Sequence, residues 1–87
     1  SDLVFRQILE YIAVKTPAIY KILRTRVENY GEGAKIYVEV TVMYGYNVIN
    51  GIKDFKDRAR KEIEKLTAMN VVELEVVAKN IYVPEEH

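Results

Sequence analysis

The segment YGYNVING, residues 44–51, contains the residue types from which anion-binding loops are built. Glycine lets the backbone approach a phosphate closely, and the free N–H groups at the start of a helix attract anions. The spacing matches neither the P-loop nor the dinucleotide-binding fingerprint. We therefore interpret Gly45 as the exit from a strand and Asn47 as the N-cap of a helix. A small-molecule or anion sensor at the Tyr46–Asn50 turn is the alternative.

Nucleophilic and metal-binding side chains are scarce in this chain. It has no cysteine, a single serine at Ser1 and a single histidine at His87. A Ser-His-Asp or Cys-His catalytic system cannot be assembled from this inventory, and zinc–thiolate sites are excluded. We expect no enzymatic activity, no cofactor and no bound metal. A cysteine-free chain also fits the reducing cytoplasm.

The acidic residues are scattered along the chain, mostly beside a lysine or an arginine. Glu73 and Glu75 share one face of an expected strand and could meet Glu39 on a neighbouring strand. Such acids could serve general acid–base chemistry, but a solvated sheet face is the simpler interpretation.

The charge balance argues against nucleic acid as the partner. Thirteen basic residues are matched by thirteen acidic ones, whereas nucleic-acid-binding proteins usually carry a basic surplus. The GXXG loop of KH domains is absent as well. The alternative is a small KH-like domain that binds single-stranded nucleic acid through a basic strip formed by Lys21, Arg24, Arg26 and Lys35.

The apolar periodicity predicts the order helix, strand, strand, helix, strand. The expected ranges are residues 3–13, 19–28, 35–44, 48–66 and 71–83, with NYGEGA as a hairpin turn. This is an α+β fold over a single domain, residues 1–87, with two helices on one face of a small three-stranded sheet. We expect the first strand at the centre and the third strand antiparallel beside it. No apolar run approaches the roughly 20 residues that a membrane helix needs, so direct membrane insertion is not expected.

The clearest element is KIYVEVTVMY, in which two sets of residues alternate. The apolar set is expected to face the core: Ile36, Val38, Val40, Val42 and Tyr44. In the two helices, the residues at helical spacing are Phe5, Ile8, Leu9 and Ile12, and then Val48, Ile52, Phe55, Ala59, Ile63 and Leu66.

If both helices cover one face of the sheet, the other face is left open as a candidate interaction surface. The residues that we assign to it are Tyr37, Glu39, Thr41, Met43, Val77 and Ile81. An exposed apolar and aromatic surface on a small protein usually marks self-association or a protein partner. Terminal residues beyond this sequence could instead close the face. An edge strand is a second possible assembly surface, by strand addition.

Three segments of the sequence resemble the alkaline shock protein family, the Gls-type general stress proteins of mainly Gram-positive bacteria. VEVTVMYGYNV resembles the family's alternating strand closed by Tyr-Gly-x-Asn-Ile. EIEKLTAMNVVELEVVAKNIYV resembles its charged helix, its Met-Thr-Gly-Leu joint and its valine-rich strand, and YIAVKTPAIYKI resembles its Ile-Ala helix before Val-Pro-Gly-Val. Ala18 and Ala68 stand where the family usually has glycine, so both turns must form without the easy positive φ of glycine.

The resemblance implies a cytoplasmic, non-enzymatic protein linked to envelope or alkaline stress. It also implies that the protein self-associates or docks to a membrane-anchored partner. We therefore expect a homo-oligomer or a protein partner, and neither nucleic acid nor direct membrane insertion. No catalytic residues are carried over from the family.

Overall fold

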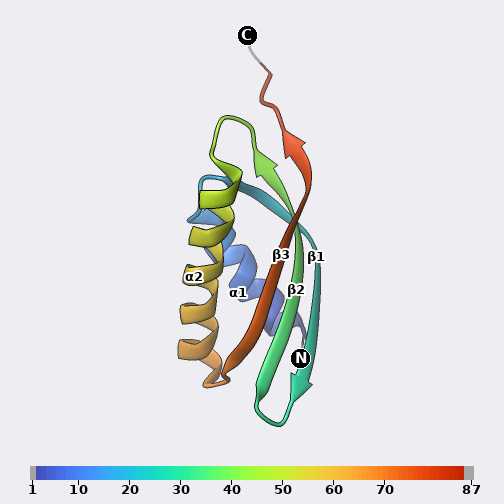
Figure 1. Cartoon of the computed structure of the whole chain (residues 1–87), viewed down its shortest axis with the longest axis vertical. Coiled ribbons are helices and arrows are strands. Elements are labelled where there is room, and N and C mark those ends of the chain that lie inside the picture. The colour runs from blue at the N-terminus through green and yellow to red at the C-terminus, as the bar shows by residue number, and fades with distance from the viewer. Residues whose placement is uncertain (1, 86–87) are drawn as a thin grey trace.

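The computed structural model describes residues 2–85 and has an α+β fold. The elements are α1 (Asp2–Val14), β1 (Ile19–Tyr30), β2 (Gly33–Met43), α2 (Val48–Thr67) and β3 (Val71–Tyr82). The three strands form one sheet, and both helices lie on the same side of it (Figure 1). The fold class and the element order expected from the sequence are confirmed.

The expected position of the first strand was wrong. The strand order is β1-β2-β3, so β2 is central, antiparallel to β1 and parallel to β3. The physical reason is visible in the sequence of β2, whose core-facing residues are apolar and β-branched, as suits a strand that has neighbours on both sides. β1 carries charged residues along much of its length, which is typical of an edge strand.

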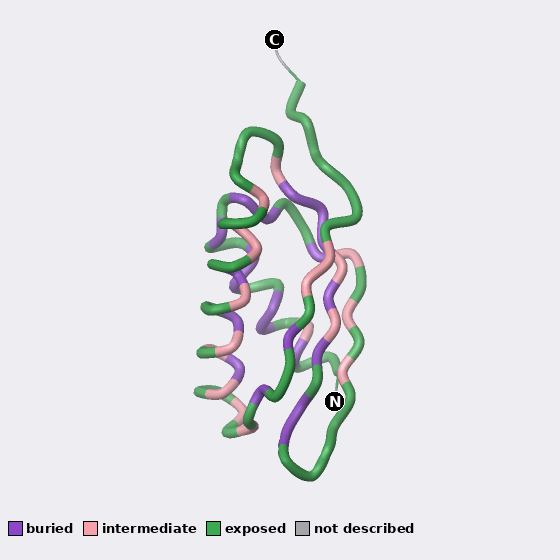
Figure 2. The backbone as a smooth tube through the Cα atoms, viewed as in Figure 1, coloured by how far each residue is buried: buried purple, intermediate pink, exposed green. Residues whose placement is uncertain are grey.

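The core lies between the sheet and the two helices. Its sheet side is formed by Ile36, Val38, Val40 and Val42, and its helix side is formed mainly by Phe5, Ile8, Leu9, Ile12, Phe55, Ala59 and Ile63. Figure 2 shows the buried positions turned inward along the helices and the central strand. Two residues expected in the core are instead exposed: Leu66 at the end of α2 and Tyr44, which lies just beyond β2. Leu66 lies in the last turn of α2, and Tyr44 lies in the turn between β2 and α2.

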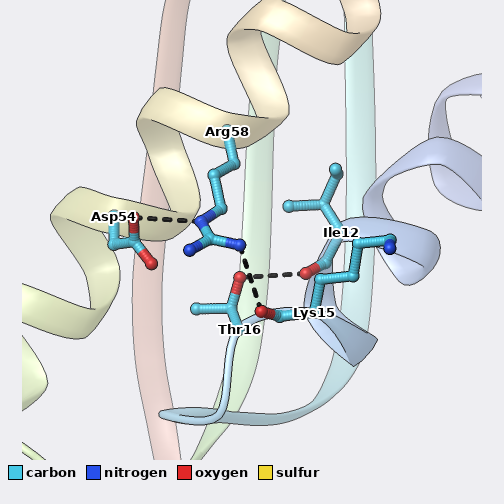
Figure 3. A network of polar contacts seen from close by, with 5 residues as sticks. All are labelled: Ile12, Lys15, Thr16, Asp54 and Arg58. Atoms are coloured by element: carbon cyan, nitrogen blue, oxygen red, sulfur yellow. Dashed lines mark hydrogen bonds and ion pairs between the residues drawn. The ribbon is translucent and has the colours of Figure 1, made fainter.

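Polar contacts fix the end of α1 against α2 (Figure 3). Arg58 on α2 donates from Nε to Asp54 Oδ1 at 3.1 Å and from Nη1 to the carbonyl oxygen of Lys15 at 3.2 Å. Thr16 donates from Oγ1 to the carbonyl oxygen of Ile12 at 2.9 Å. The Arg58 bond satisfies the carbonyl of Lys15, just past the end of α1, whereas the Ile12 carbonyl also accepts the Lys15 N–H at 3.0 Å.

Contacts between residues close in sequence stabilise the turns before and after α2. Gly45 has a φ of +98° and ends β2, and the Asn47 side chain accepts a hydrogen bond from the Asn50 N–H at 2.9 Å. The strand exit and the N-cap expected at these two residues are therefore present. At the other end, Ala68 has a φ of +59° and donates its N–H to Glu64 O at 3.1 Å.

Replacing Ala68 by glycine is expected to stabilise the domain. The left-handed conformation costs a non-glycine residue about 1–2 kcal/mol, and the greater freedom of glycine in the unfolded chain offsets about 0.4–1 kcal/mol of that gain. Ala68→Gly should therefore raise the free energy of unfolding by about 0.5–1 kcal/mol. Ala68→Val, whose branched side chain tolerates this conformation poorly, should lower it, and urea denaturation followed by circular dichroism measures both. A lower stability of Ala68→Gly would contradict the assignment of strain to this residue.

Candidate interaction face

Within residues 2–85, no helix covers the second face of the sheet, which we call the open face (Figure 1). On β2 it consists of the residues that alternate with the core: Lys35, Tyr37, Glu39, Thr41 and Met43. Tyr37, Glu39 and Met43 are half-buried although no helix lies over them, because side chains of the neighbouring strands pack beside them.

The two margins of the open face carry mostly opposite charges: the β1 margin is basic except for Glu28, and Glu73 and Glu75 make the β3 margin acidic. The register places Arg26 and Glu75 on either side of Tyr37, and Arg24 and Val77 on either side of Glu39. Lys21 continues the basic margin on β1, and Glu73 continues the acidic margin on β3. The face is thus polar at both edges, with an aromatic residue at its centre, and not the mainly apolar surface that the sequence suggested.

Tyr37 is held by two neighbouring charged side chains. Its hydroxyl donates a hydrogen bond to Glu39 Oε2 at 2.8 Å, and Arg26 Cζ lies 5.1 Å from the centre of its ring. The hydrogen bond to Glu39, with smaller contributions from burial and from the nearby carboxylate charges, raises the pKa of the Tyr37 phenol above its usual value. The ring is therefore fixed in a neutral, oriented state, which lowers the entropy that a binding partner would have to remove.

A pair of tyrosines closes one end of the open face. The rings of Tyr20 and Tyr82 are stacked, with centroids 4.0 Å apart and an interplanar angle of 4°. They come from the two edge strands, which lie on opposite sides of β2, so the stacked pair reaches across the central strand. This explains why Thr41 is only 5% exposed on a face that no helix covers.

Ile81 does not belong to the open face. It is in register with Val42, which faces the helices, and its side chain is 60% exposed because β3 runs past α2 there. The register between β2 and β3 shifts between the pairs Val40–Ala78 and Thr41–Asn80, which leaves Lys79 as an extra residue. A bulge of this kind reverses the alternation of faces beyond it, so strict alternation along β3 assigned Ile81 to the wrong side.

Of the six residues that the sequence assigned to the interaction surface, five lie on the open face, and two tyrosines of this face were not assigned to it. Tyr37, Glu39, Thr41, Met43 and Val77 lie on the open face. Tyr20 and Tyr82 were not predicted, whereas Arg26 was predicted as part of a basic strip and Glu75 as a neighbour of Glu39. Arg26 and Glu75 belong to this face through the register, which the order of the strands determines. Tyr20 lies at one bulge and Tyr82 lies beyond another. No local sequence pattern predicts the position of these bulges.

The turn that could bind an anion has fewer free polar groups than the open face. The turn at Tyr46–Asn50 lines a shallow pocket of about 350 Å³ with Thr16 and Gly51, but the Asn47 side chain is already engaged in capping α2.

Among residues 2–85 there is no group of three or more His, Cys, Asp or Glu side chains that could hold a metal ion. No helix in this part of the chain is both long enough and apolar enough to cross a membrane.

Comparisons with known proteins identify the fold. No family model matches the chain, and no curated protein sequence matches it. Solved structures of the MamM CTD share the architecture. The manganese form of one variant has a TM-score of 0.62 at 12% identity, covering 92% of this chain and 99% of that chain. The zinc form of another variant has a TM-score of 0.63 at 13% identity, covering 98% of this chain and 88% of that chain. At such identity the likeness shows the fold alone.

Proposed function

We propose that this protein is a non-catalytic interaction or scaffold protein that binds through the open face, either to a second copy or to a membrane-anchored protein. The observation that carries the proposal is the uncovered sheet face with Tyr37 at its centre, fixed by Arg26 and Glu39. Oriented aromatic and arginine side chains are enriched in protein interfaces and supply much of their binding energy.

The charge pattern of the face favours a protein partner. Lys21, Arg24 and Arg26 are exposed on one margin, and Glu73 and Glu75 are exposed on the other. A surface with both signs in defined positions selects the orientation of a partner that carries the complementary pattern. A partner of uniform charge would be repelled by one margin.

A link to envelope or alkaline stress is part of the proposal and rests on the sequence resemblance alone. The metal forms of the MamM CTD structures supply no argument for metal binding here, because the likeness is confined to the fold. What the proposal takes from them is an architecture in which the helices cover one face of the sheet.

Replacing Tyr37 and Met43 together by serine is expected to weaken association at least tenfold, because the variant loses the aromatic centre of the face and an apolar neighbour. Light scattering across a concentration series measures self-association, and capture of a membrane-anchored partner on the immobilised chain measures docking. Tyr46→Ser with Ile49→Ser is the matched control, since these side chains are exposed outside the open face. Unchanged association of the Tyr37 and Met43 variant, with its fold intact by circular dichroism, would remove the open face from the proposal.

A second candidate function is binding of single-stranded nucleic acid. Lys21, Arg24 and Arg26 form an exposed basic line along β1, beside the ring of Tyr37, and Lys35 lies on the same face. Basic grooves with an aromatic ring are typical of single-strand binders. However, three carboxylates lie on the same face: Glu28 on β1 itself, Glu39 on β2 and Glu75 on β3. Fluorescence anisotropy with a labelled single-stranded RNA at low salt tests this function, and no binding there would exclude it.

A further inference from the structure

The outer edge of β1 is a free strand edge. β1 is an outer strand of the sheet, and Figure 1 shows no helix or strand of residues 2–85 beyond it. In an antiparallel pair, every second residue of an edge strand directs its N–H and C=O groups away from the neighbour, so these groups can bond to another strand. Near the start of β1, Arg6 on α1 donates to the carbonyl oxygen of Ile22 at 3.4 Å, so α1 already contacts the backbone there.

The remainder of this edge is regular. Both register shifts between β1 and β2 lie before Arg24, and the pairing is uninterrupted over residues 24–30. Bulges are one of the features by which natural sheets protect their edges against further pairing, and this segment has none. Its seven residues can therefore pair with a second strand along their whole length.

The charged side chains of this segment are available to another chain. Arg24, Arg26 and Glu28 lie on one face of β1, and the ion pairs among residues 2–85 do not include them. Glu28 accepts a hydrogen bond from the Tyr30 hydroxyl at 2.7 Å. Lys35 is in register with Glu28, but its ammonium group lies over the Tyr30 ring, 5.0 Å from the ring centre.

We propose that β1 pairs antiparallel with β1 of a second copy, about a two-fold axis that passes through Val27 perpendicular to the sheet. Directly opposed residues then lie on the same face, and the three strands of each copy join into one sheet. Val27 lies opposite the partner's Val27, Arg26 opposite the partner's Glu28, and Arg24 opposite the partner's Tyr30. The axis repeats each contact, so the pairing contains two Arg26–Glu28 pairs of opposite charge.

The order of the charges selects this register. An axis at Arg26 would place this residue opposite the partner's Arg26, and an axis at Glu28 would place two carboxylates opposite each other. An axis at Thr25 would place Arg24 opposite the partner's Arg26. Like charges directly opposite destabilise a strand pair. The axis at Val27 avoids these contacts, and it alone pairs all seven residues because Val27 is the middle of the regular segment.

The other free edge, on β3, does not have this property. Register shifts with β2 leave residues 73–78 as its regular segment. The charged residues of that segment are Glu73 and Glu75, so no register within it brings opposite charges together. β1 carries both signs, in an order that complements itself when the strand direction is reversed. A second copy of β1 is therefore the partner whose charges match this edge.

Cysteine cross-linking tests the register, because the natural chain has no cysteine. Val27→Cys alone should form a disulfide-linked dimer under mild oxidation, since opposed Cα atoms of antiparallel strands are about 4.5–5.5 Å apart and a disulfide needs about 4.4–6.8 Å. Thr25→Cys alone should form at least tenfold less, because the two copies of residue 25 are offset by about 14 Å along the strands. A mixture of Thr25→Cys and Asn29→Cys should link, because these positions are opposed.

Charge reversal tests the pairing without cross-linking chemistry. Arg26→Glu and Glu28→Arg should each lower the association constant about tenfold, because two attractive contacts become repulsive. An equimolar mixture of the two variants should associate as the natural chain does, since a mixed pair restores opposite charges at both contacts. Lys21→Glu is the matched control: it makes the same change of charge on β1 outside the regular segment and should change association by less than about twofold. Analytical ultracentrifugation measures the constants, and circular dichroism checks the fold.

Each outcome bears on the proposal. Absence of the Val27→Cys dimer overturns it, and efficient linkage of Thr25→Cys to itself overturns the register. If the mixture of Arg26→Glu and Glu28→Arg associates no better than either variant alone, these two side chains do not face each other and the proposal is wrong.

This interface is separate from the function proposed for the open face. The two-fold axis keeps the open faces of both copies on the same side of the joined sheet, so pairing through β1 leaves them uncovered. The variant with serine at residues 37 and 43 should still form the Val27→Cys cross-link, because neither residue lies on the β1 edge. Loss of open-face binding with an intact cross-link, or the reverse, shows which of the two proposals has failed.

Discussion

Phe55→Ala should lower the free energy of unfolding by about 3–5 kcal/mol, the cost of removing a large side chain from a closed core. Phe55 is fully buried on α2 and belongs to the core cluster between the helices and the sheet. Small domains have total free energies of unfolding of about 5–15 kcal/mol, so this substitution would remove a large part of the total stability. Urea denaturation followed by circular dichroism at neutral pH measures the change.

Two controls show whether the loss comes from the core. Phe55→Leu keeps most of the apolar volume and should cost less than about half as much as Phe55→Ala. Ile49→Ala removes an apolar side chain from the same helix at a position that is 80% exposed, and it should change stability by less than about 0.5 kcal/mol. If Phe55→Ala were as mild as Ile49→Ala, the packing of α2 on the sheet described above would be wrong.

Gly33→Ala should lower the free energy of unfolding by about 2–5 kcal/mol, from backbone strain and from a steric clash. Gly33 has a φ of +144°, and a Cβ atom there would lie 2.3 Å from the carbonyl oxygen of Asn70. The same oxygen accepts a hydrogen bond from the Ala34 N–H at 2.9 Å, so it cannot move away without breaking the start of the β2–β3 pairing.

Gly31 provides a control within the same turn. A Cβ atom at Gly31 would meet nothing within 4 Å. Gly31→Ala should therefore leave stability within about 0.5 kcal/mol of the natural chain, as a surface substitution usually does. Thermal melts of the two variants side by side measure the difference, and equal melting temperatures would contradict the close approach of Gly33 to Asn70.

The sequence by itself determined the elements and most of the core. Its apolar periodicity placed α1, both hairpin strands, α2 and β3 close to their observed bounds. It also identified the Asn47 cap, because a cap depends on residues within one turn of one another. These features are local, so short windows of sequence contain the information that decides them.

Only the tertiary structure decided the strand order and the composition of the open face. Whether β1 or β2 is central depends on which strand the chain returns to after α2, and the contacts that decide this join residues far apart in sequence. The bulge at Lys79 then reversed the faces of the last residues of β3, moving Ile81 off the open face and Tyr82 onto it. A bulge forms where pairing with a neighbour demands an extra residue, so its position depends on that neighbour and not on the strand alone.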